Sequence, residues 1–182
     1  MALVTDGKHF GQYTYEHWYD REHGNAEDIL IDELKTDDID FVSNLVDSVF
    51  DEFVGKDYSE EGNNSFKDYI KPQNILNRYI EKSSQFIIAN YGSEIIGILE
   101  IKNKDHISLF FIKKKYQGKG IGKKLFGYYL RIIKNENPEI KTITVNSSIY
   151  AEKIYSRMGF IKSGEIQEKD GIKYIPMEYE NK

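Results

Sequence analysis

Three glycines within a run of lysines are the residues best suited to bind an anion. The segment Gln117-Gly-Lys-Gly-Ile-Gly122 lies between a short apolar run and an amphipathic pattern. Glycines let the backbone turn tightly and expose consecutive N–H groups, and a helix N-terminus adds about half a positive charge. Six lysines fall between residues 113 and 124: Lys113, Lys114, Lys115, Lys119, Lys123 and Lys124. The pattern predicts a phosphate-binding loop.

Two common phosphate-binding motifs do not fit this loop. A Walker motif needs Ser or Thr after its lysine, whereas Lys123 is followed by Lys124. A dinucleotide fingerprint needs a third glycine where Lys123 stands and a parallel strand before the loop. A glycine turn without a ligand, a solvated lysine face and a small nucleic-acid patch are the alternatives. We expect no nucleic-acid partner, because the lysine run lacks interleaved exposed aromatic residues for base stacking.

Two motifs carry a resemblance to a known family. The first is Gln117-x-x-Gly120-x-Gly122 after the apolar residues 109–112, and the second is Ala151-x-x-x-Tyr155-x-x-x-Gly159-Phe160. Separated by one predicted strand, they resemble the motifs of the Gcn5-related N-acetyltransferase (GNAT) family. The resemblance extends from Ile29 to about Tyr179.

The resemblance implies that acetyl-CoA is bound as the acyl donor. The strand ending at Ile112 would diverge from the strand at 142–145, and backbone groups of residues 110–112 would pair with the pantetheine arm. Amides of residues 118–123 would hold the pyrophosphate. The family often has an asparagine seven residues before the helix tyrosine, and here that position is Ser148, so Ser148 and Asn146 are weaker contacts. The implied cofactor-binding residues are Phe110, Phe111, Ile112, Gln117, Gly118, Lys119, Gly120, Ile121, Gly122, Lys123 and Ser148.

The resemblance also assigns Tyr155 as the catalytic proton donor. Direct transfer to an amine in a ternary complex suits a chain without cysteine. The alternative for Tyr155 is a core tyrosine, since the chain has 14 tyrosines. The general base is left open among Glu100, His106, Glu52 and ordered water. A noncatalytic CoA-binding regulatory module is the main alternative function.

The hydrophobic periodicity predicts an α/β domain. We expect a mixed, mostly antiparallel central sheet with helices on both faces. The predicted strands are 29–34, 86–89, 94–101, 107–112, 142–145, 160–164 and 172–177. Helices are predicted after Thr36, over 65–81 with a break at Pro72, from Gly120 to about 135–138, and after Ser147 or Ser148, the last with inner residues Ala151, Ile154, Tyr155 and Met158. A polar loop is predicted at 55–64. The domain occupies 28–182 and follows an N-terminal extension, 1–27.

Composition limits the partners. The 182 residues are 40% hydrophobic and 30% charged, with a net charge of −5. No apolar run approaches the roughly 18 residues of a membrane helix, and no signal peptide is recognised, so we expect a cytoplasmic protein without membrane partners. His9, His17 and His23 lack zinc-motif spacing, and we expect no metal. The acid-rich segment 27–61 points to a cationic or amine acceptor, either a small molecule or a protein amine. A homodimer is left open.

Overall fold

The computed structural model describes residues 29–181, whose centre is a twisted sheet. Its strand order is β1-β2-β3-β4-β5-β8-β6, with β7 paired to β8. Within the described residues, the pairing of β4 with β5 is the single parallel one. The strands are β1 (Ile29–Glu33), β2 (Ser84–Tyr91), β3 (Glu94–Lys102), β4 (His106–Ile112), β5 (Thr142–Ser147), β6 (Ile161–Lys162), β7 (Gln167–Lys169) and β8 (Ile172–Glu180). The predicted mixed, mostly antiparallel α/β sheet is confirmed.

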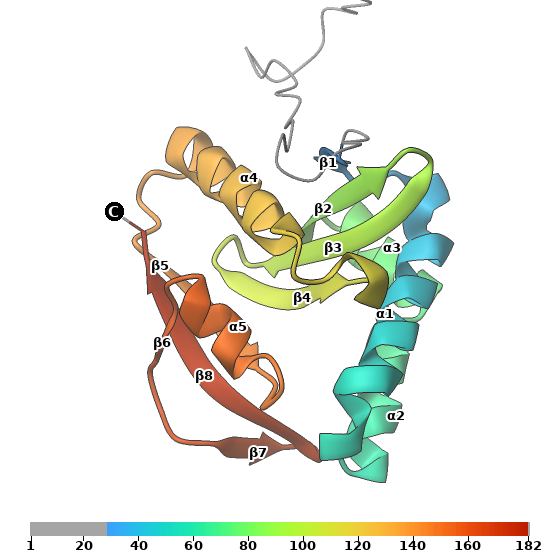
Figure 1. The fold of residues 1–182 in the computed structure, drawn as a ribbon, viewed down its shortest axis with the longest axis vertical. Coiled ribbons are helices and arrows are strands. Elements are labelled where there is room, and N and C mark those ends of the chain that lie inside the picture. The colour runs from blue at the N-terminus through green and yellow to red at the C-terminus, as the bar shows by residue number, and fades with distance from the viewer. Residues whose placement is uncertain (1–28, 182) are drawn as a thin grey trace, which may run out of the picture.

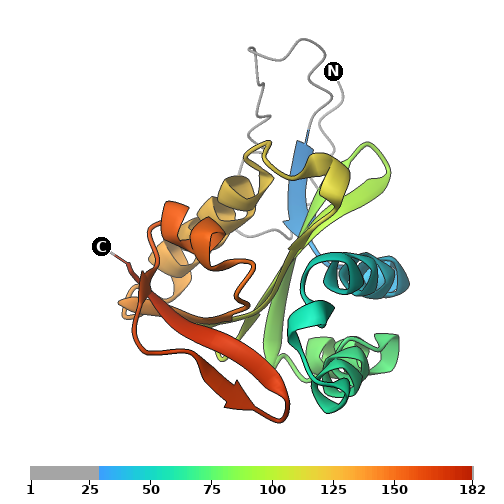
Figure 2. The ribbon, with the colours of Figure 1, turned by 60° about the horizontal axis from the view of Figure 1, so that its bottom comes forward.

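Helices cover both faces of the sheet (Figures 1 and 2). One face carries α1 (Ile39–Phe53), α2 (Glu60–Tyr69) and α3 (Pro72–Ile80), and the other carries α4 (Ile121–Glu136) and α5 (Glu152–Arg157). Each layer has its own buried apolar cluster against the sheet. Short 3-10 turns lie at η1 (Thr36–Asp38), η2 (Gly55–Asp57) and η3 (Lys114–Tyr116). No helix among residues 29–181 is long and apolar enough to cross a membrane. The predicted extension, 1–27, lies outside the described residues.

The structure corrects the predicted loop at 55–64. Helix α2 begins at Glu60, because Ser59 caps it by accepting a hydrogen bond from the Gly62 N–H at 3.1 Å. Glu60 and Glu61 in the first turn favour this start electrostatically. A Cβ at Gly62 would lie 2.4 Å from the carbonyl oxygen of Gly171. The glycine here allows α2 to approach the β7–β8 turn rather than marking a loop.

Helix α5 also differs from its prediction. It is confined to six residues, and Ile154, predicted to face inward, is 46% exposed. Tyr155 is buried as predicted. Tyr155 is the one buried residue of this six-residue helix, so the apolar spacing of Ile154 did not indicate a buried position. The predicted strand 160–164 shrinks to β6, whereas β8 extends beyond its prediction to Glu180.

Strand β4 separates from β5 after two paired residues. His106 and Ile107 pair with Thr144 and Val145, and no further pairing follows within the described strands. Against β3, the register passes from Ile101–Ile107 to Glu100–Leu109. Ser108 is therefore an extra residue, a β-bulge, which bends the strand and increases its twist. Figure 1 shows β5 and β8 diverging from β4.

Candidate active site at the divergence of β4 and β5

The glycine loop leads into α4 at the open end of the diverging strands. Gly118 has φ of +75° and Gly120 has φ of +78°, in the left-handed region where glycine is favoured. A Cβ added at either position meets no atom within 4 Å. These glycines are therefore required by backbone conformation and not by crowding. The first backbone N–H groups of α4 have no acceptors within the helix and are oriented to bind an anion.

The loop is fixed to the end of β4. Gln117 Nε2 donates a hydrogen bond to the carbonyl oxygen of Ile112 at 2.9 Å. At Gly122, an added Cβ would lie 3.4 Å from Ile112 Cδ1 and 3.5 Å from Phe110 Cζ, so the first turn of α4 packs directly on β4. Lys119 and Lys123 are exposed around this turn, whereas Ile121 is buried in the core. Gln117 thus anchors the loop.

Backbone groups of β4 face the divergence at alternate residues. The Lys113 N–H bonds the Ile96 carbonyl at 2.9 Å, on the β3 side. Because backbone groups alternate along a strand, those of Ile112 and Phe110 face away from β3. The same alternation directs the backbone groups of Phe111 toward its β3 partner Ile98. Phe110 therefore directs its N–H and carbonyl toward an extended ligand, and Ile112 directs its N–H, since the Ile112 carbonyl already accepts from Gln117 Nε2.

Tyr155 lies buried beside the exposed edge of β4. Its ring centroid is 6.0 Å from that of Phe110 and 5.2 Å from that of Phe160. Burial raises the pKa of Tyr155, and the nearby Tyr58 raises it further. The phenol is therefore neutral at physiological pH and can donate a hydrogen bond.

Tyr58 is a residue that the sequence analysis missed. It follows η2 on the opposite helical layer and packs against Phe50 at 5.4 Å. Burial, followed by the charge of Asp57, raises the pKa of Tyr58 to about 12. Phe66 lies next to it and also contacts Phe111, with centroids 5.9 Å apart. No motif marks these aromatic residues, and only the high tyrosine content of the chain hints at them.

Aromatic and ionic contacts connect α1 to the segment before α5. Phe53 stacks on Tyr150 at 4.9 Å, and the Tyr150 hydroxyl contacts Gln117 Oε1 at 3.5 Å. Lys114 pairs with Glu52, and its Nζ lies 5.7 Å from the centre of the Phe53 ring. The end of α1 therefore lies beside the glycine loop and forms one wall of the candidate site.

The three candidate bases all have partners. Glu52 is paired with Lys114. Glu100 is 0% exposed, with Arg78 Nε 2.7 Å from its Oε1. His106 Nδ1 is 2.8 Å from Thr144 Oγ1, and burial lowers the pKa of His106. None of them is a free carboxylate or imidazole at the divergence of the strands.

The two weaker contacts implied by the family differ in surroundings. Ser148 Oγ accepts a hydrogen bond from the Ala151 N–H at 3.2 Å, near the start of α5. Asn146 is exposed on β5. Ser148 therefore stabilises the turn before α5, while its hydroxyl proton is available to a ligand.

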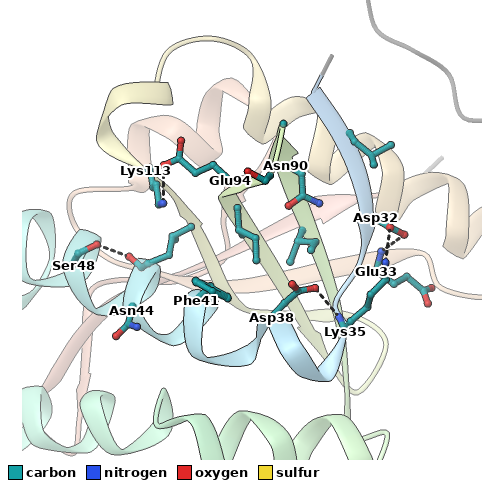
Figure 3. Close-up of a pocket in the computed structure, with 16 residues that line it drawn as sticks. Asp32, Glu33, Lys35, Asp38, Phe41, Asn44, Ser48, Asn90, Glu94 and Lys113 are labelled. Carbon is teal, nitrogen blue, oxygen red and sulfur yellow. Dashed lines mark hydrogen bonds and ion pairs between the residues drawn. The ribbon is translucent and has the colours of Figure 1, made fainter. Parts of the chain in front are cut away.

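Two sizeable cavities lie elsewhere. One of about 700 Å³ lies between β1, the start of α1 and the β2–β3 turn (Figure 3), and one of about 870 Å³ lies near the ends of α3 and α4. Charges at the first are paired locally, Lys113 with Glu94 and Lys35 with Asp32. Tyr155 and residues 117–123 line neither cavity. Residues 29–181 contain no cluster that could hold a metal, and His9, His17 and His23 lie outside them.

Solved structures share this fold. A GCN5-related N-acetyltransferase from Rhodopseudomonas palustris superposes with a TM-score of 0.71 at 16% identity, over 84% of this chain and 95% of that chain. A PaiA N-acetyltransferase from Thermoplasma acidophilum, in complex with coenzyme A, gives 0.67 at 23% identity, over 84% and 98%. A spermidine N-acetyltransferase chimera from Vibrio cholerae gives 0.60 at 16% identity, over 86% and 96%.

The family is established at the level of sequence. No curated protein matches the chain. The sequence model of the acetyltransferase (GNAT) domain matches residues 54–181, which include both motifs and every strand from β2 to β8. The chain therefore belongs to the GNAT family of acetyltransferases.

Proposed function

We propose that this protein transfers an acetyl group from acetyl-CoA to an amine by direct attack in a ternary complex. The observation that carries the proposal is the left-handed glycine loop at the start of α4, which adjoins the unpaired edge of β4. An anion site and a row of free backbone groups thus form one continuous surface. This combination suits a ligand with a pyrophosphate at one end and an amide-bearing arm at the other.

The residues that would hold acetyl-CoA follow from this surface. The amides of residues 118–123 suit the pyrophosphate, and Lys119 and Lys123 add positive charge. Phe110 and Ile112 offer backbone groups to the pantetheine amides. Ser148 offers one hydroxyl donor. When bound, acetyl-CoA supplies an activated acyl group, and the chain supplies orientation and proton transfer.

Tyr155 is the proposed donor to the departing sulfur. Acyl transfer to an amine requires a neutral nitrogen, stabilisation of the developing negative charge on oxygen and a proton for the thiolate. The raised pKa of Tyr155 keeps its hydroxyl protonated, so it can donate a hydrogen bond as charge develops on sulfur. The absence of cysteine favours direct transfer over a thioester on the enzyme.

The proposed acceptor is an amine, cationic before it reacts. The segment from the end of α1 to the start of α2 carries exposed acids, among them Asp57, Glu60 and Glu61. Aromatic rings of Phe53, Tyr58 and Tyr150 lie close to this acidic segment. Carboxylates and aromatic faces both attract cations. The spermidine N-acetyltransferase of the same fold is consistent with an amine acceptor.

Two measurements test the function together. We expect saturating acetyl-CoA to raise Tm, with much smaller effects from NAD and ATP, because the loop fits neither of their common motifs. Thiol release should then accompany acetylation of at least one member of an amine panel, detected by mass. Binding without acetylation of any amine would identify the noncatalytic module instead. An unchanged Tm at saturating acetyl-CoA would refute the assignment.

A further inference from the structure

A buried polar cluster lies beneath the bulge of β4. Glu100 of β3 is 0% exposed and accepts from Arg78 Nε at 2.7 Å and Arg78 Nη2 at 3.3 Å. The Tyr69 hydroxyl donates to Glu100 Oε1 at 3.1 Å. Ser108 acts on the same hydroxyl as a side-chain donor and lowers the pKa of Tyr69. We call Ser108, Tyr69, Glu100 and Arg78 the Glu100 cluster.

The outer end of this cluster lies where the strands begin to diverge. Ser108 is half-buried and directly follows Ile107, the last residue of β4 that pairs with β5. A ligand arm paired with Ile112 and Phe110 and anchored at the glycine loop would run toward Ser108. It would end there, because β5 closes the edge at Ile107. At about 3.3 Å per residue, Ser108 lies ~13 Å along the strand from Ile112. The reactive end of the arm therefore belongs beside Ser108.

The cluster forms a directed chain of hydrogen bonds. Ser108 can donate to the Tyr69 oxygen, Tyr69 donates to Glu100, and Arg78 holds the carboxylate at the inner end. Arg78 is itself fixed by the carbonyls of Tyr69 at 2.9 Å and Asn74 at 3.0 Å, and it lies 3.8 Å from the Tyr69 ring centre. A buried ion pair contributes little net stability compared with apolar packing. Its place below the bulge therefore suggests a chemical use.

We propose that Ser108, Tyr69 and Glu100 form a proton relay that takes the proton released by the acceptor amine. This inference rests on the proposed function. As the amine nitrogen bonds to the acyl carbon and the carbon–sulfur bond breaks, the amine proton passes to Ser108 Oγ. The Ser108 proton passes to Tyr69 Oη, and the Tyr69 proton passes to Glu100. The departing thiolate is stabilised by a hydrogen bond from the Tyr155 hydroxyl and takes its proton from solvent, and Glu100 later returns the amine proton to solvent along the same chain.

The relay explains how a fully buried carboxylate can serve as the base. Glu100 does not touch the amine, whereas Ser108 at the bulge does. Burial, followed by the charge of Glu100, raises the pKa of Tyr69 to about 12. Tyr69 is thus a proton carrier that returns to its neutral form. Ser108 is the catalytic residue, and Tyr69, Glu100 and Arg78 act through it.

Two conservative variants test the relay. Tyr69→Phe keeps the ring beside Arg78 and deletes the hydroxyl, and Ser108→Ala removes the outer end. Each should lower kcat by about 10²-fold, the lower end for general base catalysis, without changing the acetyl-CoA-induced rise in Tm. Tyr79→Phe on α3, on the same helical layer but outside the cluster, is the matched control and should retain kcat. Glu100→Gln would leave the Arg78 charge buried and unpaired, so it tests folding more than catalysis.

Two further readouts separate a relay from a structural role. The double variant Ser108→Ala/Tyr69→Phe should lose no more activity than either single variant, because both interrupt one chain. The loss should also be smaller when excess hydroxide or added buffer base can take the amine proton in place of the relay, so kcat of the variants should rise with pH or buffer concentration more steeply than that of the wild type. The relay would be overturned by near wild-type kcat in both single variants, or by losses that multiply in the double variant. Amine acetylation by the wild type would still uphold the proposed function in that case. A wild type that acetylates no amine would overturn both.

Discussion

A phenol buried among aromatic rings holds its proton more tightly than a phenol in water, since burial disfavours the phenolate. Tyr155 is in this situation, packed between Phe110 and Phe160. Its free-solution pKa of about 10 already exceeds that of a thiol, about 8.5, and burial raises it further. Tyr155 therefore acts in the proposed reaction as a hydrogen-bond donor that stabilises the developing thiolate while keeping its own proton.

Replacing Tyr155 with Phe keeps the ring and deletes the hydroxyl. If the hydroxyl serves the leaving sulfur, kcat should fall by roughly 10² to 10⁴. Acetyl-CoA affinity and Tm should change little, because the aromatic packing survives. Steady-state kinetics with a substrate for which chemistry limits the rate measures the first effect, and a thermal melt measures the second.

Tyr129→Phe is the matched control for that experiment. Tyr129 is also buried, and its hydroxyl donates to the Lys104 carbonyl at the β3–β4 turn. Its loss should lower Tm through a lost hydrogen bond, by about 1 kcal/mol of unfolding free energy, and leave kcat unchanged. Near-normal turnover of Tyr155→Phe would remove Tyr155 from the mechanism while leaving acetyl-CoA binding intact.

At the scale of elements, the glycine loop and the β2–β3 turn provide a clean comparison. Gly120 and Gly92 both have left-handed φ, +78° and +58°, and an added Cβ has open space at both. Valine at either position strains the backbone by about 1–2 kcal/mol or more. Gly120→Val and Gly92→Val should therefore both lower Tm. Gly120→Val alone should abolish the rise in Tm caused by acetyl-CoA, and an equal loss in Gly92→Val would contradict the loop assignment.

His106, at the short pairing of β4 with β5, is a source of acid sensitivity because it is partly buried. Burial lowers the pKa of His106, with Asp105 raising it and Lys102 lowering it to smaller extents. The unfolded chain therefore binds more protons than the folded one as pH falls through the ordinary histidine pKa of about 6.5, and stability is lost on the acid side. Above that pH the imidazole is neutral in both states and contributes no pH dependence.

His106→Gln should flatten this acid dependence. Glutamine is uncharged and can still hydrogen-bond Thr144. Unfolding free energies measured by denaturant titration between about pH 5 and pH 7 should fall less steeply in the variant than in the wild type. Comparing the two proteins cancels the contribution of carboxylates such as Glu33, whose pKa is raised by burial. Parallel curves would show that His106 does not titrate on unfolding.

The elements differed in how far the sequence could predict them. The lone polar bulge residue Ser108 interrupts an apolar run and carries no periodicity signal, so the bulge depends on its register with β3. The second half of α2 falls in the predicted helix 65–81, but its start at Glu60 was missed among polar residues, although Ser59 and the following acids are an N-cap pattern. The stack of Phe53 on Tyr150 joins two segments that are far apart in the sequence, so no local pattern predicts it. By contrast, the tight turn at Gly118 and Gly120 could be predicted from the sequence, because the preference of glycine for left-handed φ is local and does not depend on tertiary contacts.

At the scale of the whole molecule, charge is divided between two walls of the candidate site. The net charge is −5, yet lysines gather around the glycine loop and acids around α1 and α2. The structure modifies the strength of this acidic wall, since Lys67 lies 3.3 Å from Asp47 and 2.9 Å from Asp51. The exposed acids at the start of α2, Glu60 and Glu61, therefore carry much of the attraction that a cationic acceptor would experience.

This attraction predicts a salt-dependent KM. Exposed charges are screened over about 10 Å at 0.1 M salt, so raising ionic strength should increase the KM for a cationic amine severalfold. An amine that is neutral at the assay pH should be affected much less. Glu60→Gln/Glu61→Gln should raise the KM at low salt and flatten its salt dependence. Glu136→Gln/Glu139→Gln changes net charge equally at the far end of α4 and should leave the dependence unchanged. Equal effects of the two double variants would attribute the salt dependence to net charge alone. The exposed acids would repel an anionic acceptor, so a preference for an anionic acceptor would contradict the proposed cationic amine.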